Sequence, residues 1–240
     1  MSFLKLFTPP SIDWPNKFQT REERAEHPLL KKYYHYGLPD PATPIGDIEF
    51  LAIDLETTGL NSNKDEIISI GAVPFTLNRI CLNRAKEWIV KPKRKLAEES
   101  IVIHGITHSD IENAPDLITV LPELLEMMTH KIMVVHFLDI ERFFLDKAFK
   151  SRLDEGIEFP LIDTMKIEQR VLKKNQRVFF NLFNSTKKIS TRLALSRRRY
   201  GLPNYPPHHA LTDAIATAEL LQAQISHYYH PTQPISHFWL

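Results

Sequence analysis

The chain of 240 residues has a single cysteine, Cys81, and lacks any apolar run near the ~18 residues that a membrane span needs. One cysteine excludes both a disulfide and a cysteine zinc site within the chain. The N-terminal stretch, which contains Pro9 and Pro10, is too short and too broken for a signal peptide. Internal repeats and low-complexity segments are also absent. We therefore expect a soluble, cytoplasmic protein that makes no membrane contact.

Apolar residues make up 43% of the sequence, enough for a real core, and the net charge is only +1. The charge is unevenly spread, because eleven Lys or Arg and a single acid, Glu168, lie between Lys166 and Arg199. Phe179, Phe180 and Phe183 lie among them. Cations neutralise phosphates and aromatic faces stack on unpaired bases, so the segment suits single-stranded nucleic acid. A solvated helix face with core phenylalanines explains it equally well.

The sequence divides into an arm, a main body and a tail. Residues 1–46 form the arm, in which Thr20-Arg21-Glu22-Glu23 has the form of a capping box and predicts a helix that starts at Thr20. Pro28 is expected to kink or restart that helix, and Pro39 to Pro44 is a stiff linker. We interpret the arm as a packing element, with a partner-binding helix as the alternative. Residues 47–230 are the main domain, and 231–240 the tail.

Hydrophobic periodicity in the main body predicts an α/β fold. Apolar or partly alternating runs indicate strands, and 3.6-residue patterns indicate helices. Three strands come first, as an antiparallel meander, and strands then alternate with helices. We therefore expect a mixed five-stranded sheet, with the meander followed by parallel strands and with helices on both faces. The expected strands are residues 50–57, 67–73, 80–90, 132–136 and 161–162, and the main helices are 114–129, 141–149 and 209–228, with a further helix from Thr164.

Two carboxylates interrupt the first strand. Asp54 and Glu56 are two residues apart, so on a strand they point to the same side, about 7 Å apart. Two carboxylates this close repel each other and lower the stability of the fold unless a partner neutralises them. A bound hard cation such as Mg²⁺ or Mn²⁺ is the usual partner. A surface turn with two solvated acids is the simpler alternative for this tripeptide. Thr57, Thr58 and Gly59 then end the strand, and the glycine allows a ligand to approach the backbone.

A histidine and an acid lie five residues apart at the start of the last helix. Pro206 and Pro207 stop the chain before His208, and Asp213 begins the apolar helix. A histidine beside an acid suits proton transfer near neutral pH. A helix-start histidine with an exposed acid is the alternative. The small residues Ala214, Ala216 and Ala218 follow and allow a close approach of this helix to a sheet.

A third group of acids follows the strand at 132–136. Asp139 and Glu141 lie where that strand passes into a helix, and ligand sites of open α/β sheets lie at such strand ends. Either acid is placed to aim a carboxylate at Asp54 and Glu56. Charge stabilisation of the helix N-terminus, worth about 0.3–1 kcal/mol, is the alternative role.

Taken together, these residues resemble the DnaQ-like 3′–5′ exonucleases of the DEDDh branch, the family of the proofreading ε subunit of bacterial DNA polymerase III. Residues 53–59 match its opening motif, and residues 207–214 match its last motif. Residues 103–107, which include His104, resemble its segment before the first helix. The middle motif departs from the family, since Glu141 stands at the usual aspartate and Phe137 at the usual asparagine. Asp139 is out of register and ranks second.

The resemblance implies an RNase H-like fold and hydrolysis of phosphodiester bonds at a 3′ end, with release of nucleoside monophosphates. It implies two divalent ions, Mg²⁺ or Mn²⁺, the first held by Asp54, Glu56 and Asp213 and the second by Asp54 with Glu141. His208 would take the proton from the attacking water. The expected substrate contacts are Thr57, Thr58, Gly59, Leu60, His104, Lys173, Lys174 and Arg177.

We expect the substrate to be a single-stranded 3′ end, of DNA rather than RNA, with a DNA polymerase or repair protein as a further expected partner. An RNA 3′ exonuclease of the same family is the alternative within the enzyme class. A module that binds nucleic acid or a polymerase without cutting is the alternative outside it, and the Glu141 substitution favours that alternative. The intact set of Asp54, Glu56, His208 and Asp213 favours the enzyme.

Overall fold

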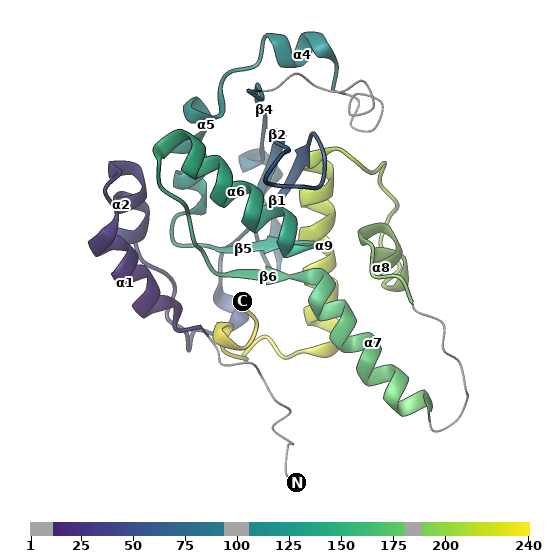
Figure 1. Ribbon diagram of the computed structural model, residues 1–240. Coiled ribbons are helices and arrows are strands. Elements are labelled where there is room, and N and C mark those ends of the chain that lie inside the picture. The colour runs from purple at the N-terminus through teal and green to yellow at the C-terminus, as the bar shows by residue number, and fades with distance from the viewer. Residues whose placement is uncertain (1–11, 94–105, 181–188) are drawn as a thin grey trace.

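A mixed sheet forms the centre of the protein in a computed structural model that describes residues 12–93, 106–180 and 189–240 (Figure 1). Strand β1 pairs antiparallel with β2 and parallel with β5, and β6 continues the sheet parallel to β5. Strands β3 and β4 both pair antiparallel with β2. The described strands are β1 (Phe50–Thr57), β2 (Ile67–Thr76), β3 (Arg79–Ile80), β4 (Lys86–Ile89), β5 (Ile132–Val135) and β6 (Leu161–Asp163).

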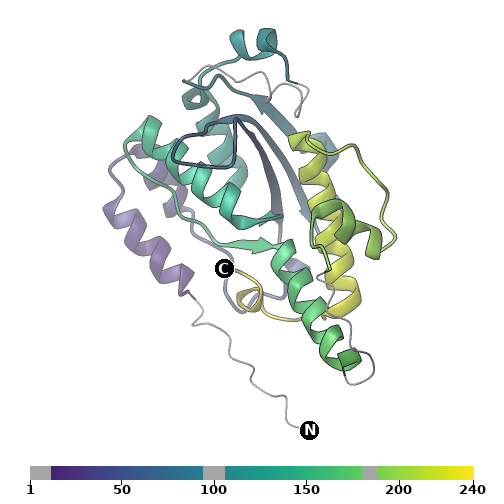
Figure 2. The ribbon, with the colours of Figure 1, turned by 45° about the vertical axis from the view of Figure 1, so that its right-hand side comes forward.

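Helices surround this sheet, and in Figure 2 the strands run between α6 on one side and α9 on the other. The α/β fold with helices around a mixed sheet is therefore confirmed. No described helix has both the length and the apolar character to cross a membrane. The described helices are α1 (Trp14–Arg24), α2 (Pro28–His35), α4 (His108–Glu112), α5 (Leu117–Met128), α6 (Leu138–Leu153), α7 (Thr164–Phe180), α8 (Leu193–Arg199) and α9 (Ala210–Tyr228).

The described sheet has six strands rather than the expected five, because the segment expected as one strand over 80–90 is divided. A short 3₁₀ helix, Leu82–Arg84, separates β3 from β4. On this side of β2 the carbonyl of Pro74 accepts a hydrogen bond from the Cys81 N–H at 2.9 Å. Proline has no N–H to donate in return, so the ladder is interrupted there.

The arm begins its helix earlier than the capping-box pattern predicted. Helix α1 starts at Trp14, where the Asp13 carboxylate accepts from the Asn16 N–H, and Pro15 occupies the first turn. Thr20 lies inside the helix and donates its hydroxyl to the Asn16 carbonyl at 2.9 Å. A proline at the first turn with an aspartate before it is the stronger start signal. The expected restart at Pro28 is confirmed, since α2 begins there.

Both ends of the described chain pack on the main body. Trp14, Phe18 and Tyr34 are buried, and the Tyr34 hydroxyl accepts a hydrogen bond from the Glu158 N–H at 2.9 Å. In the tail, the Leu240 N–H donates to the carbonyl of Leu161 in β6 at 2.8 Å. The packing role expected of the arm is therefore visible. The boundaries after residues 46 and 230 stay predictions.

Helix α9 lies directly on the sheet at Gly71 of β2. A Cβ atom at this position would lie 2.2 Å from the backbone of Ala210 and Leu211 in the first turn of the helix. Ala214 and Ala218 continue the contact and are fully buried, as the small residues predicted. Gly71 pairs with Asp54 across the β1–β2 ladder, so the absence of a side chain brings the start of α9 to the level of Asp54.

We expect Gly71→Ala to lower the free energy of unfolding by about 1–3 kcal/mol, because the added methyl group meets backbone that must move as a unit. Chemical denaturation measures the change. Gly46→Ala is the matched control, since its Cβ would lie 3.1 Å from a side-chain atom of Pro231 and needs only a small shift. Equal stability of the two variants would contradict the close approach of α9.

Candidate active site

Three carboxylates meet where β1 ends and α9 begins. Asp54 and Glu56 project from the same side of β1, and Asp213 lies in the first turn of α9. One ligand oxygen from each of the three lies within 4.8 Å of the others. The period of the strand aligns the first two acids, and the close approach of α9 at Gly71 supplies the third. The structure therefore brings together the three acids that the sequence proposed for one ion.

The electrostatics of this group are those of like charges held out of water. Burial raises the pKa of Asp54 well above its usual value, and the nearby carboxylates of Glu141, Asp213 and Glu56 raise it further. Burial also raises the pKa of Asp213, to which Glu56 adds. Carboxylates placed so closely repel each other unless a proton or a cation lies between them. Three hard oxygen donors at this spacing fit Mg²⁺ or Mn²⁺, which prefer carboxylate ligands.

Glu141 is the fourth acid and lies on α6, with 3% of its surface exposed. Its Oε2 atom is buried and has no hydrogen-bond partner among the described residues. Burial raises the pKa of this carboxyl, and Asp163 adds to the effect. By contrast, Asp139 is exposed on the same first turn. The geometry therefore favours Glu141 over Asp139 as the acid that faces Asp54.

Asp163, at the end of β6, is a residue that the sequence reasoning did not single out. It is buried, and its Oδ1 accepts hydrogen bonds from the N–H groups of Met165 and Lys166 at the start of α7. Its Oδ2 accepts from the Leu138 N–H at 3.1 Å and so fixes the start of α6, the helix that carries Glu141. The signal was an aspartate between a short apolar strand and a helix, which is typical of an N-cap.

His208 lies in the loop before α9, where the chain adopts a positive φ of 67°. Its backbone N–H donates to Asp213 Oδ2 at 2.9 Å, so an acid of the cluster itself holds the loop. His208 is exposed and lines a hollow together with Glu56, Glu87 and His209. His209 Nδ1 lies 3.5 Å from Glu87 Oε1 of β4. An exposed imidazole beside the acids is placed to accept a proton from a water molecule held there.

The turn after β1 is held by its own contacts. The Thr57 hydroxyl donates to the Gly59 carbonyl at 2.7 Å, and the Thr58 hydroxyl accepts from the Glu66 N–H at 3.0 Å. A Cβ at Gly59 would lie 2.6–2.8 Å from the atoms of the Asp65 carboxylate. The glycine therefore makes room for Asp65, and its contact with a substrate stays a prediction. Leu60 is 85% exposed at the tip of this turn.

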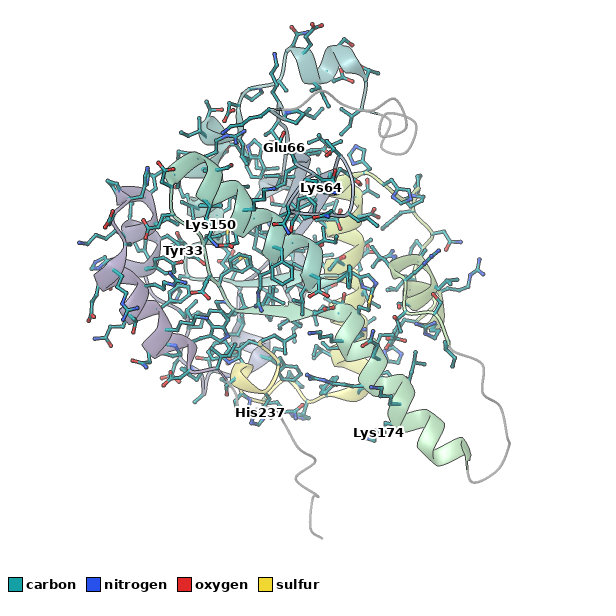
Figure 3. All side chains as sticks on the ribbon, viewed as in Figure 1. Tyr33, Lys64, Glu66, Lys150, Lys174 and His237 are labelled. Carbon is teal, nitrogen blue, oxygen red and sulfur yellow. The ribbon has the colours of Figure 1, made fainter. Side chains whose placement is uncertain are left out.

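The basic residues expected to bind substrate lie elsewhere. Lys173 and Lys174 are exposed on α7, and Figure 3 shows Lys174 far from Lys64 and Glu66, which mark the β1–β2 loop. Arg177 falls within α7, but its side chain is outside the described part. His104 also lies outside the described residues. Contact of these four residues with substrate stays a prediction, and Lys173 and Lys174 would reach only nucleotides distant from the acids.

Part of the basic segment has a structural role instead. Arg197 is 3% exposed, donates to the carbonyls of Ala216 and Pro203, and pairs with Glu219 at 2.7 Å. It is too buried to guide a nucleic-acid strand, so not every cation of the segment is available for binding. These contacts tie α8 and the loop towards His208 to α9.

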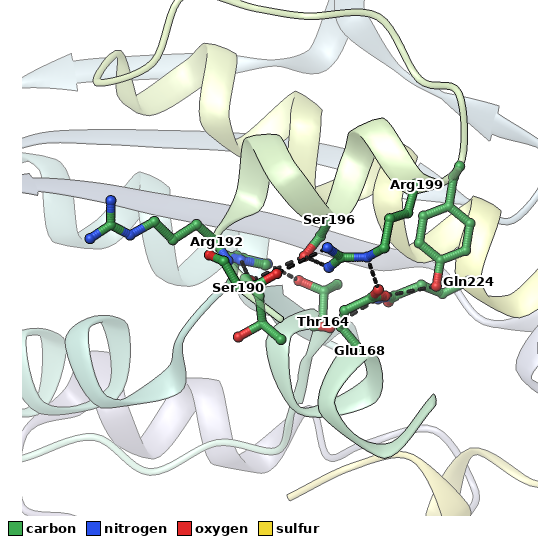
Figure 4. A network of polar contacts seen from close by, with 10 residues as sticks. Thr164, Glu168, Ser190, Arg192, Ser196, Arg199 and Gln224 are labelled. Atoms are coloured by element: carbon green, nitrogen blue, oxygen red, sulfur yellow. Dashed lines mark hydrogen bonds and ion pairs between the residues drawn. The ribbon is translucent and has the colours of Figure 1, made fainter. Parts of the chain in front are cut away.

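A second polar network joins α7, α8 and α9 around the buried carboxylate of Glu168 (Figure 4). It accepts from Arg199 Nε at 2.7 Å, from the Tyr200 hydroxyl at 2.7 Å and from Gln224 Nε2 at 3.0 Å.

Nearby, burial lowers the pKa of His136 to about 4, so this residue is neutral at pH 7. Its ring nitrogens lie 2.8 Å from the Thr164 hydroxyl and 2.9 Å from the Thr191 carbonyl.

Known proteins are similar to this chain in both sequence and fold. The exonuclease family RNase_T matches residues 51–221. The PolC-type DNA polymerase III of Thermotoga maritima is 33% identical over 184 residues, which cover 77% of this chain but 12% of that relative. The DNA polymerase III ε subunit of Aquifex aeolicus is 29% identical over 174 residues, which cover 72% of this chain and 79% of the relative. The chain thus spans about an eighth of the length of the PolC-type relative.

Solved structures show the same fold. Exonuclease X in complex with 5′-overhanging duplex DNA superposes with a TM-score of 0.57 at 21% identity, over 77% of this chain and 96% of that one. The nuclease domain of 3′hExo, a DEDDh family member bound to rAMP, gives a TM-score of 0.59 at 18% identity, over 74% and 92%. The resemblance to DnaQ-like exonucleases is confirmed. The chain therefore belongs to the exonuclease family RNase_T.

Proposed function

We propose that this chain is a metal-dependent 3′–5′ exonuclease that removes nucleoside monophosphates from the 3′ end of single-stranded nucleic acid, with DNA preferred over RNA. The observation that carries the proposal is the acidic cluster itself, in which Asp54, Glu56 and Asp213 converge within 4.8 Å beside His208. The relatives named as DNA polymerase III proteins support DNA as the substrate.

The residues divide the chemistry between them. Two bound divalent ions, Mg²⁺ or Mn²⁺, would stabilise the attacking and leaving oxygens of an in-line displacement. Asp54, Glu56 and Asp213 would hold the first ion, and Asp54 with Glu141 would hold the second. Glu141 is one methylene longer than the family's aspartate, and its unpartnered Oε2 is the atom available for this role. His208 accepts the proton of the attacking water.

An RNA 3′ exonuclease is the second candidate, because the neighbour 3′hExo was solved with rAMP bound. Association with a DNA polymerase is a further proposal, supported by the name of the ε-subunit relative. A protein that holds nucleic acid without cutting it is the remaining possibility, and the lengthened side chain at position 141 is the feature that favours it.

A direct test uses 5′-labelled single strands of DNA and RNA of matched sequence, incubated with Mg²⁺, Mn²⁺ or EDTA. We expect a metal-dependent ladder that shortens from the 3′ end, faster on DNA. Asp54→Asn is the control and should slow cleavage by about 10³-fold or more, since it removes a ligand shared by both ions. Binding without shortening in either metal would contradict the proposal, and faster shortening of RNA would reverse the substrate preference.

His208→Ala should lower the single-turnover rate of cleavage by about 10²–10⁴-fold, because the attacking water loses its general base. His227→Ala is the matched control, since its imidazole is exposed in the last turn of α9, at the opposite end of the helix from Asp213. We expect the control to retain most of the activity. Single-turnover cleavage across pH 6–9 makes the comparison, and a near-normal rate for His208→Ala would assign that residue a structural role.

A further inference from the structure

Phe137, at the position where the family has asparagine, adopts an unusual backbone conformation. Its φ is 111° and its ψ is 78°. The other non-glycine residues with positive φ in the described part, His130, Asp154 and His208, have φ between 56° and 67°, within the ordinary left-handed region. A bulky residue outside that region is a genuine outlier, and such conformations cluster at functional sites.

The side chain adds a second cost, because 41% of Phe137 is exposed. Because the ring is only partly buried, its burial contributes less stability to offset the strained backbone than a core phenylalanine would. Asparagine tolerates positive φ better than phenylalanine does. The fold therefore retains at this position a residue type that neither its conformation nor its burial favours.

The neighbours of Phe137 fix it in place from both sides. Before it, both ring nitrogens of His136 are hydrogen-bonded. After it, the Leu138 N–H donates to Asp163 Oδ2, and the Ile140 N–H donates to the Phe137 carbonyl at 3.1 Å. The backbone at Phe137 is thus held by hydrogen bonds on both sides of it.

The position of this segment is at the rim of the acidic cluster. Strand β5 runs parallel to β1 with Val134 opposite Ala52, so the chain leaves β5 at the same edge of the sheet that carries Asp54 and Glu56. Helix α6 starts immediately afterwards (Figure 1) and carries Glu141 in its first turn. An exposed aromatic residue therefore stands at the start of the helix that carries Glu141, at the sheet edge where β1 carries Asp54 and Glu56.

We propose that Phe137 contacts the substrate by stacking on an unpaired base at the 3′ end, an inference that rests on the proposed exonuclease function. Every base presents a π-face on which an aromatic side chain can stack. Removal of the aromatic ring from such a contact weakens binding by about 5- to 150-fold. The acids take the phosphate through their ions, and the ring takes the base.

Binding of a 5′-fluorescein-labelled oligothymidylate in Ca²⁺, read by fluorescence anisotropy, tests the contact. A second oligonucleotide carries abasic residues at its two 3′-terminal positions. We expect Phe137→Ala to weaken binding of the intact strand by about 5- to 150-fold and to have little effect on the abasic strand. Phe137→Tyr should restore the affinity. The control is Phe143→Ala, since Phe143 is 53% exposed on the same helix and two residues from Glu141, on the opposite side.

A variant that suits the backbone guards against a trivial loss of fold. Phe137→Asn replaces the ring with a residue that accepts positive φ, so it should bind as weakly as Phe137→Ala while it melts no lower than the wild type. Unchanged affinity for the intact strand, or an equal loss on intact and abasic strands, would overturn the stacking role. If the wild type and the variants bind the two strands as expected but the wild type does not cut in Mg²⁺ or Mn²⁺, the stacking role stands and only the proposed exonuclease function is contradicted.

Discussion

The contact of α9 with the β1–β2 ladder is the constraint on which the site depends. Helix and sheet meet at backbone distance because Gly71 has no side chain, and Gly71 is the partner of Asp54 in the ladder. The same contact places Asp213 beside Asp54 and Glu56. Packing energy from the buried face of α9 therefore holds three like charges together, which their mutual repulsion would otherwise separate.

The other parts of the site are fixed by polar contacts between neighbouring elements. Asp163 joins the start of α6 to β6 and so directs Glu141 inward. Asp213 holds the loop of His208 through the backbone, which couples the position of the expected base to that of a metal ligand. Arg197 ties the same loop to α9 further along. The positions of Glu141 and His208 thus depend on hydrogen bonds made by residues of neighbouring elements.

The sequence predicted much of this because the chemistry is local. Alternation along a strand aligned Asp54 with Glu56, and the spacing of His208 and Asp213 marked the start of a helix. The remainder depends on contacts between distant segments. No local pattern shows that Gly71 faces a helix or that Arg197 is buried against Glu219. Thr20 was misjudged because a proline and an aspartate earlier in the chain outweigh a capping box.

The central claim is that the fold holds carboxylates whose repulsion a divalent ion relieves. The raised pKa values of Asp54, Glu141 and Asp213 mean that the folded state binds protons more tightly than the unfolded state. Their contribution to stability is present below the unfolded pKa and is lost as the pH rises through the raised folded values.

The most direct measurement is the melting temperature at pH 5 and pH 8, in EDTA and in Mn²⁺, for the wild type and Asp54→Asn. In EDTA the wild type should lose more stability than the variant between pH 5 and pH 8. At a hundredfold excess over its Kd, Mn²⁺ should raise the free energy of unfolding of the wild type at pH 8 by about 2.7 kcal/mol, and with it the melting temperature. The same Mn²⁺ should have much less effect at pH 5. A wild-type melting temperature that does not respond to Mn²⁺ at pH 8 would contradict the account.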